Sequence, residues 1–127
     1  MTGLNLSQFK ARIVLPVVQA MGQGGDAALN LLTGTALVES GLSYLAQLQG
    51  PALGLWQMEP ATHDDCWTNW LRYQPDMARR ILMLCGLTCS PDAEAMVWNL
   101  RYACAMARVK YLRAPSALPA ANDAAAL

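Results

Sequence analysis

The sequence has little charge, few aromatic rings and a single histidine. Only 14% of its 127 residues are charged, and nine basic residues balance nine acidic ones. Because the net charge is zero, the chain offers no excess of positive charge to a polyanion, which argues against nucleic acid as the main partner. No apolar run approaches the roughly 20 residues that a membrane-spanning helix needs, so we expect no membrane span.

The N-terminal stretch lacks the layout of a secretory signal peptide. Lys10 and Arg12 interrupt the apolar residues, Pro16 follows them, and no clean apolar core precedes a small-residue cleavage site. The sequence therefore predicts no signal peptide.

Residues that bind metals are also scarce. Besides His63, the chain offers four cysteines, which are Cys66, Cys85, Cys89 and Cys104. A zinc site needs three or four convergent ligands, and this set predicts no metal site and no cofactor. In the absence of an export signal, we interpret the four cysteines as reduced thiols packed in the core.

What the sequence does contain is hydrophobic spacing typical of helices. Hydrophobic residues make up 54% of the chain, whose length suits one domain with a single core. Helices are predicted over residues 4–22, 27–40, 60–72, 75–84 and 91–112. In the last of these, one buried stripe is predicted, made of Met96, Leu100, Ala103, Ala107 and Tyr111. Pro16 should interrupt the first helix, and Asp26 should cap the second. Glycines and a proline divide residues 41–58 into a loop with short extended pieces. We therefore expect an all-α fold with minimal β structure.

Glu39 is an acid near the end of the predicted helix 27–40. It shares a mostly apolar stripe with Leu32 and with Thr35 or Ala36. A carboxyl group held partly out of water prefers its neutral form, and a neutral acid is what protonation of a poor leaving group requires. A solvated glutamate at a helix end is the alternative interpretation.

Two short motifs flank the loop. The first is Glu39-Ser40, and the second is Ala-Leu-Gly-Leu-Trp-Gln over residues 52–57, followed by Pro-Ala-Thr over residues 60–62. Together they resemble the lytic transglycosylase and goose-type lysozyme family. That family has Glu-Ser, a loop, Gly-Ala-x-Gly-Leu-Met-Gln and then a helix start at Pro-Ala-Thr. The resemblance extends from about residue 27 to about residue 111.

The resemblance implies a lysozyme-like helical domain over residues 1–113, with a cleft and a small irregular β or loop region. It also implies a muramidase that cleaves the β-1,4 bond between N-acetylmuramic acid and N-acetylglucosamine in peptidoglycan strands, with Glu39 as acid and base. In the lytic route, Glu39 first protonates the glycosidic oxygen and then takes the 6-hydroxyl proton as an anhydro ring closes. Hydrolysis by water is the alternative outcome.

Further residues are expected to bind substrate, namely Ser40, Tyr44, Gly54, Trp56, Gln57, Glu59 and Tyr102. Gly54 allows a close backbone approach, and the Gln57 amide either suits an acetamido group or satisfies nearby backbone groups of the loop. The resemblance implies that this glutamine lies beside the acid and helps to place the substrate. Trp56 is either a sugar-stacking platform or a core aromatic, while Tyr102 either approaches the cleft or packs in the core. Glu59 is either a second carboxylate or a helix-terminal charge.

His63, next to Asp64 and Asp65, is interpreted as solvated polar surface in the first turn of a helix, with a proton relay as the alternative. Acidic residues favour this position because of the helix dipole.

The third motif of the family, Ala-Tyr-Asn-Ala-Gly, is absent. Residues 114–127 are instead predicted as a linker and the start of a C-terminal helix, as in a truncated chain. This departure motivates a competing function, a non-catalytic peptidoglycan-binding or phage virion structural module on the same fold.

A wall-cutting enzyme without an export signal suggests a phage origin. It would then reside in the virion, with other virion proteins as partners, or in the host cytoplasm with release to the periplasm. A bacterial enzyme whose signal has been removed is the alternative.

Overall fold

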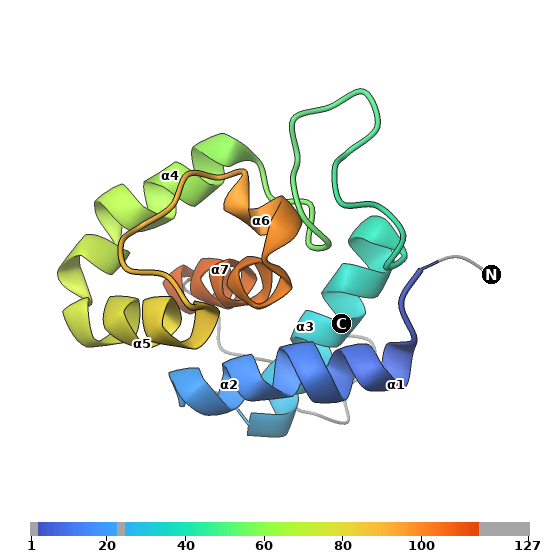
Figure 1. Ribbon diagram of the computed structural model, residues 1–127, viewed down its shortest axis with the longest axis horizontal. Coiled ribbons are helices and arrows are strands. Elements are labelled where there is room, and N and C mark those ends of the chain that lie inside the picture. The colour runs from blue at the N-terminus through green and yellow to red at the C-terminus, as the bar shows by residue number, and fades with distance from the viewer. Residues whose placement is uncertain (1–2, 23–24, 115–127) are drawn as a thin grey trace.

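Helix α7 (Leu100–Arg113) is the element around which the other helices pack (Figure 1). The computed structural model describes residues 3–22 and 25–114. Every residue from Tyr102 to Val109 is buried, so this stretch of α7 is covered on all sides. The sequence predicted one buried stripe on this helix, and that expectation was too narrow. Three alanines, at positions 103, 105 and 107, let neighbouring helices approach closely.

The predicted first helix is present but divided into three parts. It consists of α1 (Leu6–Phe9), a π-helical turn η1 (Lys10–Val14) and α2 (Leu15–Met21). The side chain of Asn5 caps its start by accepting a hydrogen bond from the Gln8 amide at 3.0 Å. The predicted interruption is therefore confirmed.

Pro16 explains where the interruption falls. Proline has no N–H to donate to the carbonyl of Arg12, four residues earlier. The side chain of Arg101 donates to that carbonyl instead, at 3.2 Å. This contact joins the N-terminal helical segment to the start of α7.

Helix α3 (Gly25–Ser40) delivers Glu39 in its last turn, as predicted. Asp26 lies in the first turn of this helix rather than at its N-cap, because the helix begins at Gly25. An acid in the first turn still interacts favourably with the helix dipole.

The loop that follows α3 carries the only β pairing in the described residues. Isolated antiparallel bridges join Ala46 to Leu53 and Leu53 to Met58, and no extended sheet forms there. Residues 41–59 thus form an irregular loop that leads into α4 (Pro60–Asn69).

Prolines and glycines place the next helix boundaries as predicted. Pro60 and Pro75 stand in the first turns of α4 and α5 (Pro75–Cys85), where their missing N–H costs nothing. A short 3-10 turn, η2 (Leu71–Tyr73), connects the two helices. Gly86 ends α5 with a φ of 72°, a left-handed conformation that glycine adopts without strain.

The predicted helix 91–112 was wrong at its N-terminal half. The structure has a single turn, α6 (Ala95–Trp98), then a break at Asn99, then α7. The Asn99 side chain accepts a hydrogen bond from the Tyr102 amide at 3.1 Å and donates one to the Cys85 carbonyl at 3.0 Å. Asn99 thereby caps α7 and ties its start to α5, which stabilises the break.

The cysteines occupy different environments. Cys66 and Cys104 are buried and Cys85 is half-buried, as expected for core residues. Cys89 is exposed, so the core interpretation was wrong for this residue. It lies after Gly86 in the connection between α5 and α6, outside the packed helices.

The described part of the chain is mostly helical, and the all-α fold class is as predicted. None of its helices is both long enough and apolar enough to cross a membrane. The expectations for residues 114–127 concern, apart from Ala114, residues outside those that the structure describes.

Candidate functional site

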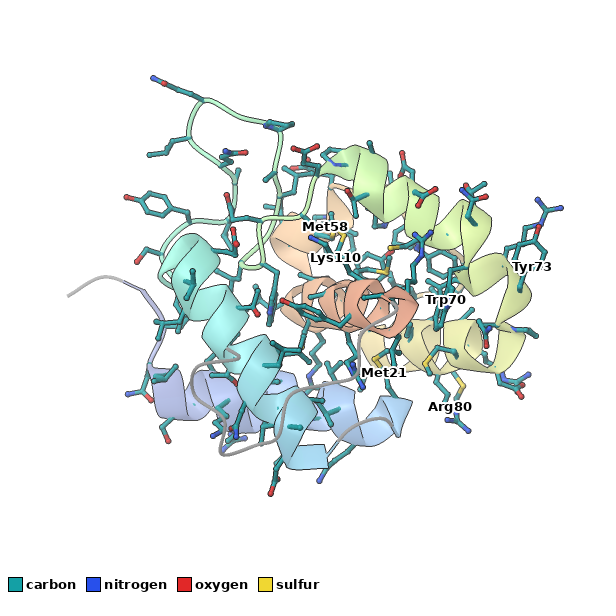
Figure 2. The ribbon with its side chains drawn as sticks, turned by 180° about the vertical axis from the view of Figure 1, so that it is seen from behind. Met21, Met58, Trp70, Tyr73, Arg80 and Lys110 are labelled. Carbon is teal, nitrogen blue, oxygen red and sulfur yellow. The ribbon has the colours of Figure 1, made fainter. Side chains whose placement is uncertain are left out.

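A cavity of about 110 Å³ lies between α3, α7 and the end of the 41–59 loop, and we call it the α3–α7 cavity. Figure 2 shows Met58 from the loop beside Lys110 from α7, at the place where these two walls meet. The cavity is lined by Thr35, Glu39, Trp56, Gln57, Met58, Ala107, Lys110 and Tyr111. The structure thus brings together three of the residues that the sequence singled out, Glu39, Trp56 and Gln57.

Glu39 reaches this cavity from the last turn of α3. Its side chain is exposed, which differs from the partial burial expected from the apolar stripe. The neighbouring positions Leu37 and Val38 are exposed as well, whereas Ser40 in the same turn is buried, so one side of the last turn of α3 faces solvent. Within the described ranges, no hydrogen bond or ion pair holds the Glu39 carboxylate, so it is open to a ligand.

Gln57 adopts a backbone conformation that side chains rarely take, with a φ of 52°. Its backbone amide and its Nε2 both donate to the carbonyl of Gly54, at 3.0 and 2.9 Å. These bonds fix the side chain and leave its Oε1 as an acceptor. Strained residues of this kind persist where the surrounding structure determines them, and they cluster at functional sites.

Trp56 packs mainly as a core aromatic, which is one of the two roles between which the sequence did not decide. Its ring is buried, its Nε1–H donates to the Leu32 carbonyl at 2.8 Å, and its centroid lies 5.4 Å from that of Phe9. Most of the ring is therefore part of the core, and what remains borders the cavity. This geometry favours a core aromatic with a cavity-facing edge over a sugar-stacking platform.

Two cavity residues from α7, Lys110 and Tyr111, were missed as site residues. The Thr35 hydroxyl donates to the Leu31 carbonyl at 2.7 Å, so it accepts from the Tyr111 hydroxyl, which lies 2.8 Å away. The Tyr111 oxygen keeps its lone pairs for a ligand. The sequence did place Tyr111 on the stripe with Ala107, and only the structure shows that this stripe borders a cavity.

Ser40 and Gly54 are buried and do not line the cavity. The Ser40 hydroxyl donates to the Ala36 carbonyl at 3.0 Å and accepts from the Leu42 amide, which secures the end of α3. At Gly54 the φ is +78°, and an added Cβ would lie 2.5 Å from the Met96 carbonyl oxygen. The close approach expected at Gly54 is therefore made by the backbone of α6, not by a ligand.

Tyr44 and Glu59 are exposed but lie outside the cavity lining. Glu59 occupies the N-cap position of α4 without a capping hydrogen bond from its side chain, which agrees with its interpretation as a helix-terminal charge.

Tyr102 packs in the core, where it is fully buried in a polar network. Its hydroxyl accepts from Trp67 Nε1–H at 2.7 Å and donates to His63 Nε2 at 2.6 Å. This direction leaves the proton of His63 on Nδ1, from which it is donated to Asp64 at 2.9 Å. Burial raises the pKa of the Tyr102 hydroxyl well above its usual range, against the opposing effect of the Trp67 hydrogen bond.

The same network corrects the expectation for His63. We expected a solvated residue, but His63 is 1% exposed. A buried imidazole needs partners for both ring nitrogens, and Tyr102 and Asp64 supply them. The described residues contain no group of three or more His, Cys, Asp or Glu side chains that could hold a metal ion.

Comparison of the chain with protein-family models, with curated proteins and with solved structures finds no significant match. A function for this chain must therefore be argued from the chemistry of the α3–α7 cavity and from the motifs that border it.

Proposed function

We propose that the protein is a muramidase of the lytic transglycosylase type, which cleaves the β-1,4 bond between N-acetylmuramic acid and N-acetylglucosamine in peptidoglycan. The observation that carries the proposal is the convergence of Glu39 and Gln57 on one cavity. These residues come from the two motifs that resemble the family, and residues 40–56 separate them in the sequence.

Glu39 has the position of a general acid. It is the only acidic residue that lines the cavity in the part of the chain that the structure describes. A bound sugar would displace water from the carboxyl group, and desolvation favours the neutral form that can protonate the glycosidic oxygen. The proton given to the leaving oxygen is regained when Glu39, then a carboxylate, takes the proton of the 6-hydroxyl as this oxygen closes the anhydro ring.

Among the described residues, no second carboxylate lines the cavity, and this supports the lytic route over a two-carboxylate one. Glycosidases of the latter kind place a second carboxyl group about 5 to 9.5 Å from the acid. Among the described residues, Glu59 does not line the cavity. Ring closure by the substrate's own hydroxyl needs no second protein carboxylate.

Gln57 and Tyr111 are proposed to position the substrate. With its Nε2 held by Gly54, the Gln57 amide presents Oε1 to the N–H of an acetamido group. Tyr111 would serve in place of the tyrosine of the missing third motif, since α7 brings its ring to the same cavity as Glu39.

Mass spectrometry of the muropeptides released from purified sacculi tests the proposal. The wild-type protein is expected to release products with anhydro ends, and Glu39→Gln is expected to release about 10²- to 10⁴-fold less. Because Glu39 is exposed, the variant should keep its stability to within about 0.5 kcal/mol. Reducing ends would indicate hydrolysis instead, and release that survives Glu39→Gln would exclude Glu39 as the acid.

A non-catalytic peptidoglycan-binding or virion module is the second candidate function. Two observations favour it: the cavity holds only about 110 Å³, and no neighbouring side chain orients the Glu39 carboxylate in the described part of the chain. Binding sites for small molecules usually measure about 300 to 1,000 Å³. This candidate predicts that the wild-type protein sediments with sacculi but releases no muropeptides. Glu39→Gln should sediment with sacculi equally well.

A further inference from the structure

Lys110 brings a positive charge to the α3–α7 cavity. It lies in the last turn of α7, its side chain is exposed, and it borders the cavity together with Met58 (Figure 2). Within the described ranges it has no hydrogen bond and no ion pair, although Glu39 lines the same cavity. The ammonium group is therefore available to a ligand while the acid stays unpaired.

Of the other three basic residues of α7, two bind elsewhere in the fold and one is buried away from the cavity. Arg101 donates to the Arg12 carbonyl, and Arg113 forms an ion pair with Asp65 at 2.7 Å. Arg108 is buried and does not line the cavity. Lys110 alone among the cations of α7 faces this site.

A lysine ammonium is a compact point charge with three donors and no acceptor. Neutral sugar hydroxyls and acetamido groups are recognised well by uncharged side chains, and Gln57, Thr35 and Tyr111 already supply these. A cation beside them adds affinity for a ligand that carries a negative charge. On a glycan strand, that charge is a carboxylate.

We propose that Lys110 makes the cavity selective for glycan strands that carry a carboxylate next to the bond bound at Glu39. This inference rests on the proposed function and deepens it. The carboxylate has two sources in peptidoglycan: the lactyl group of a muramoyl residue without a peptide, or the peptide itself.

Binding is measured by calorimetry in the Glu39→Gln background, so that no ligand is consumed. The ligands are peptide-free glycan strands, the same strands with their carboxyl groups converted to methyl amides, peptide-bearing strands, and a neutral chitooligosaccharide. Lys110→Gln is compared with Lys10→Gln, which removes the only other lysine and lies outside the cavity. Lys110→Arg, which keeps the charge, is the conservative variant.

Lys110→Gln is expected to weaken the binding of carboxylated strands about two- to fivefold, in the range of an exposed charge pair. Methyl-amidated strands and the chitooligosaccharide should be unaffected, and so should every ligand with Lys10→Gln. Lys110→Arg should keep most of the selectivity. Added salt should reduce the preference of the parent protein for carboxylated strands, because screening weakens exposed charge pairs. A loss of affinity on peptide-free strands would assign the carboxylate to the lactyl group, and a loss on peptide-bearing strands would assign it to the peptide.

An equal loss on charged and neutral strands would overturn the inference, and so would no effect of Lys110→Gln or no binding of any strand. Selective binding by a protein that cleaves no sacculi would leave the inference standing while the proposed activity fails. If the protein cleaves sacculi but Lys110→Gln leaves the binding of every strand unchanged, the proposed activity stands and the inference about Lys110 fails.

Discussion

The hydroxyl of Tyr102 lies 2.6 Å from Nε2 of His63, although the two residues come from α7 and α4. Trp67 donates to the same hydroxyl, and Asp64 accepts from the other nitrogen of His63. Each polar atom in this chain of hydrogen bonds has a partner, which is the condition under which a buried polar network stabilises a core. The network fixes α4 against the central helix.

Tyr102→Phe is expected to destabilise the protein by about 1 to 3 kcal/mol, because it leaves buried groups of His63 and Trp67 without a partner. Chemical denaturation measures the change. His63→Phe in combination with Tyr102→Phe should cost less than the sum of the two single changes, since the second removes a group already left unpaired. Strict additivity would show that the two side chains are not coupled.

Gln57→Gly tests whether activity needs the Gln57 side chain, because the variant removes that side chain and relieves the backbone strain at the same position. The variant removes the cost of a left-handed backbone but also the hydrogen bond from Nε2 to Gly54, which is worth about 1 kcal/mol. Its free energy of unfolding should stay within about 1 kcal/mol of the wild type, because glycine also has more entropy to lose on folding. Release of muropeptides should fall at least tenfold.

Gln49 offers the matched control, since it is exposed, has a φ of 59°, and lies outside the cavity lining. Gln49→Gly should stabilise the protein by up to about 1 kcal/mol and leave the release of muropeptides unchanged. Equal losses of activity in the two variants would mean that loop flexibility, not the Gln57 amide, is responsible.

Gly54→Ala is expected to destabilise the protein by more than about 2 kcal/mol, because a side chain there combines positive φ with a Cβ placed 2.5 Å from a backbone oxygen. Gly34→Ala in α3 provides the contrast, since nothing lies within 4 Å of its added Cβ. That substitution should stabilise the protein by about 0.5 to 1 kcal/mol. Thermal unfolding of the two variants should therefore shift in opposite directions.

Alkaline pH should destabilise the fold through its buried thiols. Burial raises the pKa of Cys85 from 9.0 to about 11, against the opposing effect of Arg101, and it raises the pKa of Cys104 as well. Above pH 9 the unfolded chain has lost these protons while the folded protein still binds them. The free energy of unfolding must then decrease as the pH rises from about 9 to 11.

Urea denaturation at a series of pH values measures this decrease. Cys85→Ala should make it shallower, whereas Cys89→Ala, which changes an exposed cysteine, should leave it as it is. An identical slope in all three proteins would rule out Cys85 as a contributor.

Much of the fold follows from local signals in the sequence. Helix boundaries fall at Pro60, Pro75 and Gly86, because the backbone preferences of proline and glycine are local and do not depend on the rest of the chain. The break at Asn99 was not predicted, because its side chain is held partly by the carbonyl of Cys85, which only the folded protein brings near. His63 was misjudged for the same reason, since its partner Tyr102 is remote in the sequence.

For the candidate site, the two walls were predictable to different degrees. Glu39 and Gln57 stand in recognisable motifs, and the structure places both at one cavity. The side of the cavity formed by α7 was not predicted. Amphipathic periodicity identifies the solvent-facing side of a helix only when the helix has such a side. Most of α7 is buried on every side, so its sequence does not distinguish the residues toward the cavity from those toward α4 or α2.

In the π-helical turn at Lys10–Val14, hydrogen bonds span five residues instead of four, which rotates the side chains before the turn relative to those after it. Phe9 and Val14 are both buried, although an α-helix would set residues five apart at roughly 140° from each other. The wider turn brings them to the same side, and the aromatic contact between Phe9 and Trp56 depends on that rotation. Deleting a single residue from this segment would give a more regular helix that turns Phe9 away from the wall of the cavity.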